Sequence, residues 1–182
     1  MPVTVVLVLL VNRSALRATL PPSPTASASP SASSSQPPSG EARSGEPAPP
    51  LPPVLVAAPP ASAGAARSCP RFLAALPLRL ADLAARPVDS PSPYVAAWGE
   101  PPVLLRCGVA RPPGFAVGAQ TIVVNGVTWF PQPRANRTVW TAVDRPVYIE
   151  VSVPTGFASG PVAVLSTQVA ATLRAQPPRP GR

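Results

Sequence analysis

The pattern of apolar and polar positions predicts β-strands through the second half of the chain. Residues 102–108 form an apolar run that begins at a proline, which the first position of a strand tolerates. Residues 121–130 hold two β-branched runs around Asn125–Gly126, a dipeptide that favours the positive φ angles of a tight hairpin turn. Residues 138–141 predict another strand. In residues 147–153 apolar and polar side chains alternate, which predicts a strand with one buried face.

Helical patterns lie on either side of these strands. On the C-terminal side Pro161 suits a first helical turn, and the proline pair 177–178 ends the element. Between them, one apolar stripe at helical spacing contains Val162, Leu165, Val169 and Leu173.

On the N-terminal side a short helix is expected after Ser68. Ser68 would cap this helix, with Pro70 in its first turn, and Pro77 disfavours helical backbone at the residue before it. Residues 78–85 fit either a second helix or a strand.

This order predicts an α+β fold: a small antiparallel sheet of about four strands, with an N-terminal and a C-terminal helix on one face. The globular domain is placed at residues 68–175, followed by a flexible tail at 176–182. Residues 20–67 are rich in Pro, Ala and Ser and are expected to be a disordered arm, because they cannot bury enough apolar surface to offset their ordering entropy. A strand at 54–58 is the alternative, which the flanking prolines disfavour.

Residues 1–19 resemble part of a signal or anchor segment. The apolar run Val3–Val11 is too short to span a bilayer but long enough for a signal-peptide core. No basic residue precedes it, and Arg13 and Arg17 follow it, the reverse of the usual polarity. We therefore expect the coding region to begin upstream of Met1 with a basic stretch and further apolar residues.

The chain contains two cysteines, Cys69 and Cys107. In an exported protein such a pair is expected to form a disulfide, whereas in the cytosol both would be free thiols. The cellular compartment decides between the two.

Four short sequence motifs in the strand region are similar to those of a known family. They are residues 96–101 with tryptophan-glycine, 103–109 with arginine-cysteine-glycine, 125–129 with asparagine-glycine-valine-x-tryptophan, and 141–151. Together they resemble domain-of-unknown-function family 3515, an actinobacterial group, over about Cys69 to Leu173. The resemblance implies a small exported or membrane-anchored envelope protein with a cysteine pair at Cys69 and Cys107. It supplies no activity that could be assigned to any residue.

Composition excludes several kinds of catalytic site. The chain has no histidine, and arginine supplies all 15 of its basic residues, so histidine-dependent triads and lysine Schiff bases cannot form. The cysteines and scattered carboxylates do not make a zinc ligand set, and no phosphate-binding glycine loop is present. We therefore predict no catalytic, cofactor-binding or metal-binding residue. A carboxylate pair acting on a glycan is the remaining enzymatic alternative, with Glu100, Asp144 and Glu150 as its acids.

The candidate binding residues are Trp98, Trp129 and Trp140. Exposed tryptophans would favour binding of carbohydrate or peptide, and buried ones would belong to the core. The net charge of +8 is spread over single arginines without interleaved aromatics, so nucleic acid is not an expected partner.

Three functions are thus open: an exported non-catalytic envelope domain that binds a protein or wall component, a glycan-acting enzyme, and a binder of an anionic polymer or nucleic acid through dispersed arginines. The first is preferred, with the chain either attached to the membrane through its N-terminus or secreted.

Overall fold

An antiparallel sheet lies at the centre of the fold. A computed structural model describes residues 51–60 and 62–182, and the predictions for residues 1–50 lie outside them. The eight strands have the order β2-β3-β5-β6-β10-β9-β8-β7, with every neighbouring pair antiparallel. Their bounds are β2 Arg79–Leu80, β3 Leu83–Arg86, β5 Val95–Trp98, β6 Val103–Val109, β7 Ile122–Val124, β8 Val127–Arg134, β9 Arg137–Ala142 and β10 Tyr148–Pro154. The α+β prediction is confirmed, but the sheet is larger than the four strands expected.

The additional strands come from residues 78–98. The ambiguous stretch 78–85 forms the β2–β3 hairpin, and Ala81 at its turn has a φ of 53°, which interrupts helical backbone. β5 was not predicted, although it pairs along its whole length with β6, from Val95 opposite Arg106 to Trp98 opposite Val103. A turn containing a cis Glu100–Pro101 peptide joins β5 to β6.

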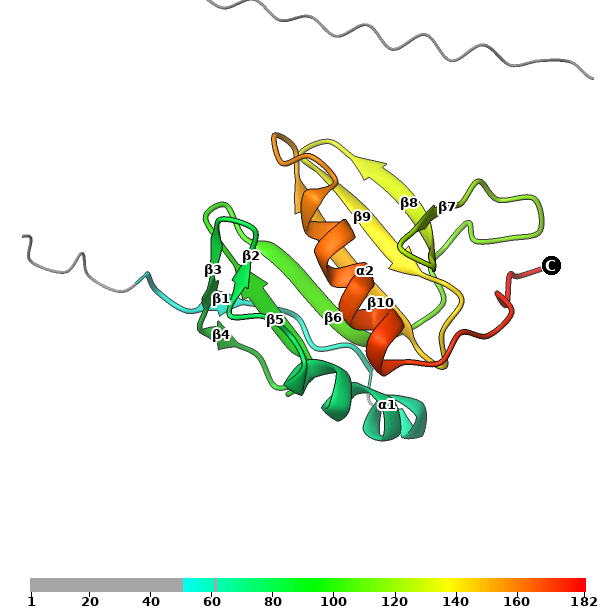
Figure 1. Cartoon of the computed structure of the whole chain (residues 1–182), viewed down its shortest axis with the longest axis horizontal. Coiled ribbons are helices and arrows are strands. Elements are labelled where there is room, and N and C mark those ends of the chain that lie inside the picture. The colour runs from blue at the N-terminus through cyan, green and yellow to red at the C-terminus, as the bar shows by residue number, and fades with distance from the viewer. Residues whose placement is uncertain (1–50, 61) are drawn as a thin grey trace, which may run out of the picture. The chain divides into compact units, whose positions relative to one another are not determined.

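The predicted hairpin at 121–130 is confirmed as β7 and β8. Asn125 and Gly126 form its turn, with φ angles of 47° and 73°. After β6 the chain crosses to this far edge of the sheet and returns strand by strand, so that β10 comes to lie between β9 and β6 (Figure 1). In β10 the predicted alternation is confirmed, because Ile149, Val151 and Val153 are all buried.

The two helices are α1, Ala63–Ala74, and α2, Gly160–Thr172. The predicted cap of α1 at Ser68 is wrong: the N-cap is Ser62, six residues earlier, where its hydroxyl accepts from the Ala65 amide at 3.0 Å. Pro70 therefore lies inside the helix, on its exposed side, where the carbonyl left without a donor can be hydrated. α2 is as predicted, with Pro161 in its first turn.

Both helices pack on the same face of the sheet, as expected. Cys107, Ile149, Ala142 and Trp129 lie opposite one another on successive strands, so their side chains share a face. Cys107 is bonded to α1, and the Trp129 indole donates to Ser166 on α2 at 2.9 Å. We call this the first face, and Figure 1 shows α2 in front of it and α1 at the lower end of the strands.

Part of the expected arm packs on the domain. Residues 51–60, which we call the strap, contain β1, Val54–Leu55, which pairs in parallel with β4, Val88–Asp89. The amides of Val54 and Val56 donate to the carbonyls of Pro87 and Asp89 at 2.9 and 3.0 Å. The prediction that residues up to 67 form only a linker is thus corrected: the prolines flank the strand without interrupting it, and Val56 is buried.

The C-terminal residues 176–182 also contact the domain, although a flexible tail was expected. The Gly181 amide donates to the Phe115 carbonyl at 2.8 Å, and the Arg179 carbonyl accepts from the Tyr148 hydroxyl at 3.0 Å. These bonds hold the long β6–β7 connection against the sheet.

Candidate functional site

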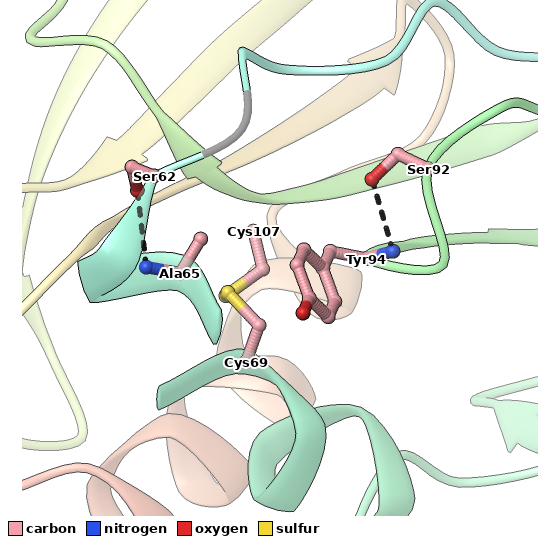
Figure 2. Close-up of a disulfide and its surroundings, with 6 residues drawn as sticks. All are labelled: Ser62, Ala65, Cys69, Ser92, Tyr94 and Cys107. Atoms are coloured by element: carbon pink, nitrogen blue, oxygen red, sulfur yellow. Dashed lines mark hydrogen bonds between the residues drawn. A yellow bond between two sulfur atoms is a disulfide. The ribbon is translucent and has the colours of Figure 1, made fainter. Parts of the chain in front are cut away.

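The predicted cysteine pair forms a disulfide between α1 and β6. The Cα atoms of Cys69 and Cys107 are 5.9 Å apart, and both residues are fully buried. Figure 2 shows the sulfur atoms with Ala65 on one side and the Tyr94 ring on the other. The bond fixes the first helix to a central strand and has a structural role.

Two of the three tryptophans belong to the core. Trp98 and Trp129 are at most 1% exposed, and their indole N–H groups donate to the Pro77 carbonyl and to Ser166, each at 2.9 Å. Trp140 is half-buried on the first face and lines a hollow of about 120 Å³ together with Phe157. The structure therefore does not bring the three tryptophans together on one surface.

The three acids of the glycan hypothesis lie in different places, each paired with its own arginine. Glu100, in the β5–β6 turn, pairs with Arg86. Asp144 is buried before β10, where it accepts from the Thr128 amide at 2.8 Å and lies 2.9 Å from the Arg145 guanidinium.

Glu150 lies in the middle of the second face of the sheet, opposite the helices. Its Oε1 accepts from Nε and Nη2 of Arg106 at 3.0 and 2.6 Å. Arg106 lies directly opposite Glu150 on the neighbouring strand, so the pair spans β6 and β10. With the acids apart and separately neutralised, no pair of them forms the two-carboxylate arrangement of a glycosidase.

A groove runs along the strap on the second face. It consists of two hollows of about 470 and 280 Å³, which share the lining residues Arg106, Val139 and Glu150. We call them together the groove. The strap lines both, with Ala58–Pro60 in the larger and Leu55–Ala57 in the smaller hollow.

The opposite wall of the larger hollow is the beginning of the β6–β7 connection, residues 109–113. Three contacts hold this wall: the Gln132 side chain donates to the Pro113 carbonyl at 2.7 Å, the ring of Phe115 packs on Phe130 with centroids 5.4 Å apart, and Gly181 bonds Phe115. Prolines on both walls, at 59–60 and 112–113, restrict the backbone and make the groove stiff.

The groove is lined by four arginines and one carboxylate. The arginines are Arg106, Arg111, Arg134 and Arg137, and the carboxylate is Glu150, which Arg106 already neutralises. Among residues 51–60 and 62–182 no carboxylate lies within ion-pairing distance of the other three guanidinium groups. The groove therefore carries a net positive charge.

Sequence reasoning missed the groove, but two signals were present. The run Val54–Leu55–Val56 is β-prone despite its prolines. Arg134 and Arg137 flank the two residues Ala135 and Asn136, and a two-residue hairpin turn places such flanking residues opposite each other.

The fold and the groove define a class of protein: a small disulfide-bonded α+β domain with an arginine-lined groove on the second face of its sheet. The chain belongs to the family described as "Protein of unknown function (DUF3515)", which matches residues 1–178. This confirms the family resemblance. No curated protein and no solved structure shows a significant match. In the part of the chain that the structure describes, no helix has both the length and the apolarity needed to cross a bilayer.

Proposed function

We propose that this protein is an exported, non-catalytic domain of the cell envelope that binds a wall component or an envelope protein in its groove. The groove is the observation that carries the proposal. It is concave and stiff, and its lining combines apolar residues such as Val139 with a smaller number of polar side chains, as binding sites commonly do.

The disulfide supports export. A buried disulfide that joins helix to sheet persists in oxidising compartments and is rare in the reducing cytosol. Attachment to the membrane through the N-terminus is part of the same proposal and follows from the apolar run Val3–Val11.

The positions of the acids favour binding over catalysis. Glu150 is the carboxylate in the groove, and its Oε1 is already bound by two guanidinium nitrogens of Arg106. Glu100 and Asp144 are bound to other arginines elsewhere.

Co-sedimentation of the full chain with insoluble wall material tests the proposal. Val139→Trp fills the groove, because Val139 lines both hollows. Val123→Trp is the matched control, since Val123 is 68% exposed on the edge strand β7. We expect the first variant to lose binding and the control to keep it, both at unchanged melting temperature.

An envelope-protein partner is tested with the same two variants on immobilised envelope proteins. Equal binding of wild type and Val139→Trp to both materials would refute the groove as the site. Export is tested separately by thiol labelling of protein from producing cells, unfolded in denaturant without prior reduction because both cysteines are buried. Labelling of Cys69 and Cys107 would contradict export.

A further inference from the structure

Two arginines in the groove face each other in an arrangement that costs stability. Arg134 and Arg137 are direct cross-strand partners at the end of the β8–β9 hairpin. Like charges at directly opposite positions of an antiparallel pair repel each other. Arg134 donates to the carbonyl of the preceding Pro133 at 3.2 Å, and Arg137 donates to neutral oxygens of Asn136 and Ser152 at 3.2 and 3.4 Å, so none of these bonds neutralises the charge.

These two arginines point to an anionic ligand. Arg134 lines the larger hollow and Arg137 the smaller one, so the pair lies where the two hollows adjoin. A phosphate there would relieve the repulsion, and guanidinium groups bind phosphate through paired, charge-assisted hydrogen bonds.

The remaining lining residues indicate the chemistry of the ligand between its anionic groups. Arg111 extends the positive charge along the larger hollow, whereas Arg106 lines both hollows and is paired with Glu150. Between these cations the groove offers Gln132, Ser152 and the carboxylate of Glu150, which are groups that hydrogen-bond hydroxyls. A uniformly charged chain would place an anion beside Glu150, whereas a chain with neutral hydroxylated units between its charges would not.

We propose that the groove binds a linear polymer in which phosphate groups alternate with polyhydroxylated units, with Arg134 and Arg137 as its main charged contact. This inference rests on the proposed function of the groove as a binding site. It narrows the ligand from a wall component or protein to one chemical class.

The test measures the affinity of the full chain for a synthetic poly(glycerol phosphate) as a function of salt. We expect Arg134→Gln/Arg137→Gln to weaken binding about tenfold and to reduce the slope of log K against log salt by about 0.7 for each phosphate that the protein no longer neutralises. The matched control is Arg67→Gln/Arg71→Gln, which removes the same charge from exposed positions on α1, across the sheet from the groove. This control should change the affinity less than twofold.

A folding readout accompanies the affinities. Without polymer, Arg134→Gln/Arg137→Gln should melt at or above the wild-type temperature, because it removes a repulsion. Added poly(glycerol phosphate) should raise the melting temperature of the wild type and leave that of the double variant nearly unchanged.

Several outcomes would overturn the inference: equal effects of the two double variants, no salt dependence, or tighter binding of polyglutamate or neutral dextran than of poly(glycerol phosphate). If Val139→Trp abolishes binding of wall material while Arg134→Gln/Arg137→Gln does not, the proposed function stands and the ligand class is wrong. If neither variant affects binding of wall material or of envelope proteins, both proposals fail.

Discussion

Gly108 is a point where α1 lies close against the sheet, and replacing it tests the packing that holds the domain together. A Cβ added at Gly108 would lie 2.4 Å from the Cβ of Ala65 and 3.6 Å from Sγ of Cys69. Gly108 also has a φ of 84°, in the left-handed region that disfavours an L side chain. Gly108→Ala therefore introduces both backbone strain and a steric overlap.

Gly118 separates these two effects. It has the same φ of 84°, but an added Cβ meets nothing within 4 Å. Gly118→Ala should therefore lower the free energy of unfolding by the backbone term alone, about 1–2 kcal/mol. Gly108→Ala should cost about 1–3 kcal/mol more, since an extra methyl in a packed core forces its neighbours to move.

A second substitution can relieve the overlap. Ala65→Gly removes the Cβ that collides, at a helix-propensity cost of about 1 kcal/mol. The double variant Ala65→Gly/Gly108→Ala should then be more stable than the sum of the single effects predicts, by about 1–3 kcal/mol.

Urea unfolding of the oxidised proteins measures the free energy of unfolding of all four variants. If Gly108→Ala costs no more than Gly118→Ala, or if the double variant shows no coupling, the close approach of α1 to β6 does not contribute to stability as described, and the reasoning is refuted.

Three further predictions concern other contacts. Replacing Cys69 and Cys107 by Ser should lower the free energy of unfolding by up to about 4 kcal/mol in urea titrations, because the bond closes a loop with a sequence separation of 38 residues. Ser166→Ala should cost about 1–3 kcal/mol in the same assay, since it leaves the buried indole N–H of Trp129 without its acceptor. Val56→Ala should loosen the strap and speed proteolytic cleavage within residues 51–60, because about 1.6 kcal/mol of apolar burial is lost.

Each of these predictions has a control, which is either chemical reduction of the wild type or the substitution of an exposed residue. Wild-type protein after reduction should match the cysteine variant. Thr167→Ala, next to Ser166 and on the exposed side of α2, should change stability by less than about 0.5 kcal/mol. Leu55→Ala should leave cleavage of the strap unchanged because Leu55 is 79% exposed, and equal cleavage of both strap variants would contradict the role given to Val56.

The elements that were predicted correctly are those whose signal is local. The Asn125–Gly126 turn and the alternation of residues 147–153 specify their structure within a few residues, and the stripe from Val162 to Leu173 does the same for α2. Such patterns depend on backbone sterics and on one buried face, which are visible without knowing the partner.

The missed elements depend on partners far along the chain. β5 is stabilised by pairing with β6, and β1 by pairing with β4 more than thirty residues away. The Pro-rich surroundings of Val54 lower its local propensity, but they do not prevent hydrogen bonds made by non-proline amides. The groove as a whole could not be predicted for the same reason, since its walls are held by the β1–β4 pairing and by contacts of the β6–β7 connection with β8 and with the C-terminal residues.

The parallel pairing of the strap has a mechanical consequence. A pull on the chain from the residues before Leu51 acts along β1, so the Val54–Pro87 and Val56–Asp89 hydrogen bonds bear the load together in shear. The strap also forms one wall of the groove. A domain under tension from that side would thus hold its ligand until both bonds break, and would then lose one wall of the groove in a single step.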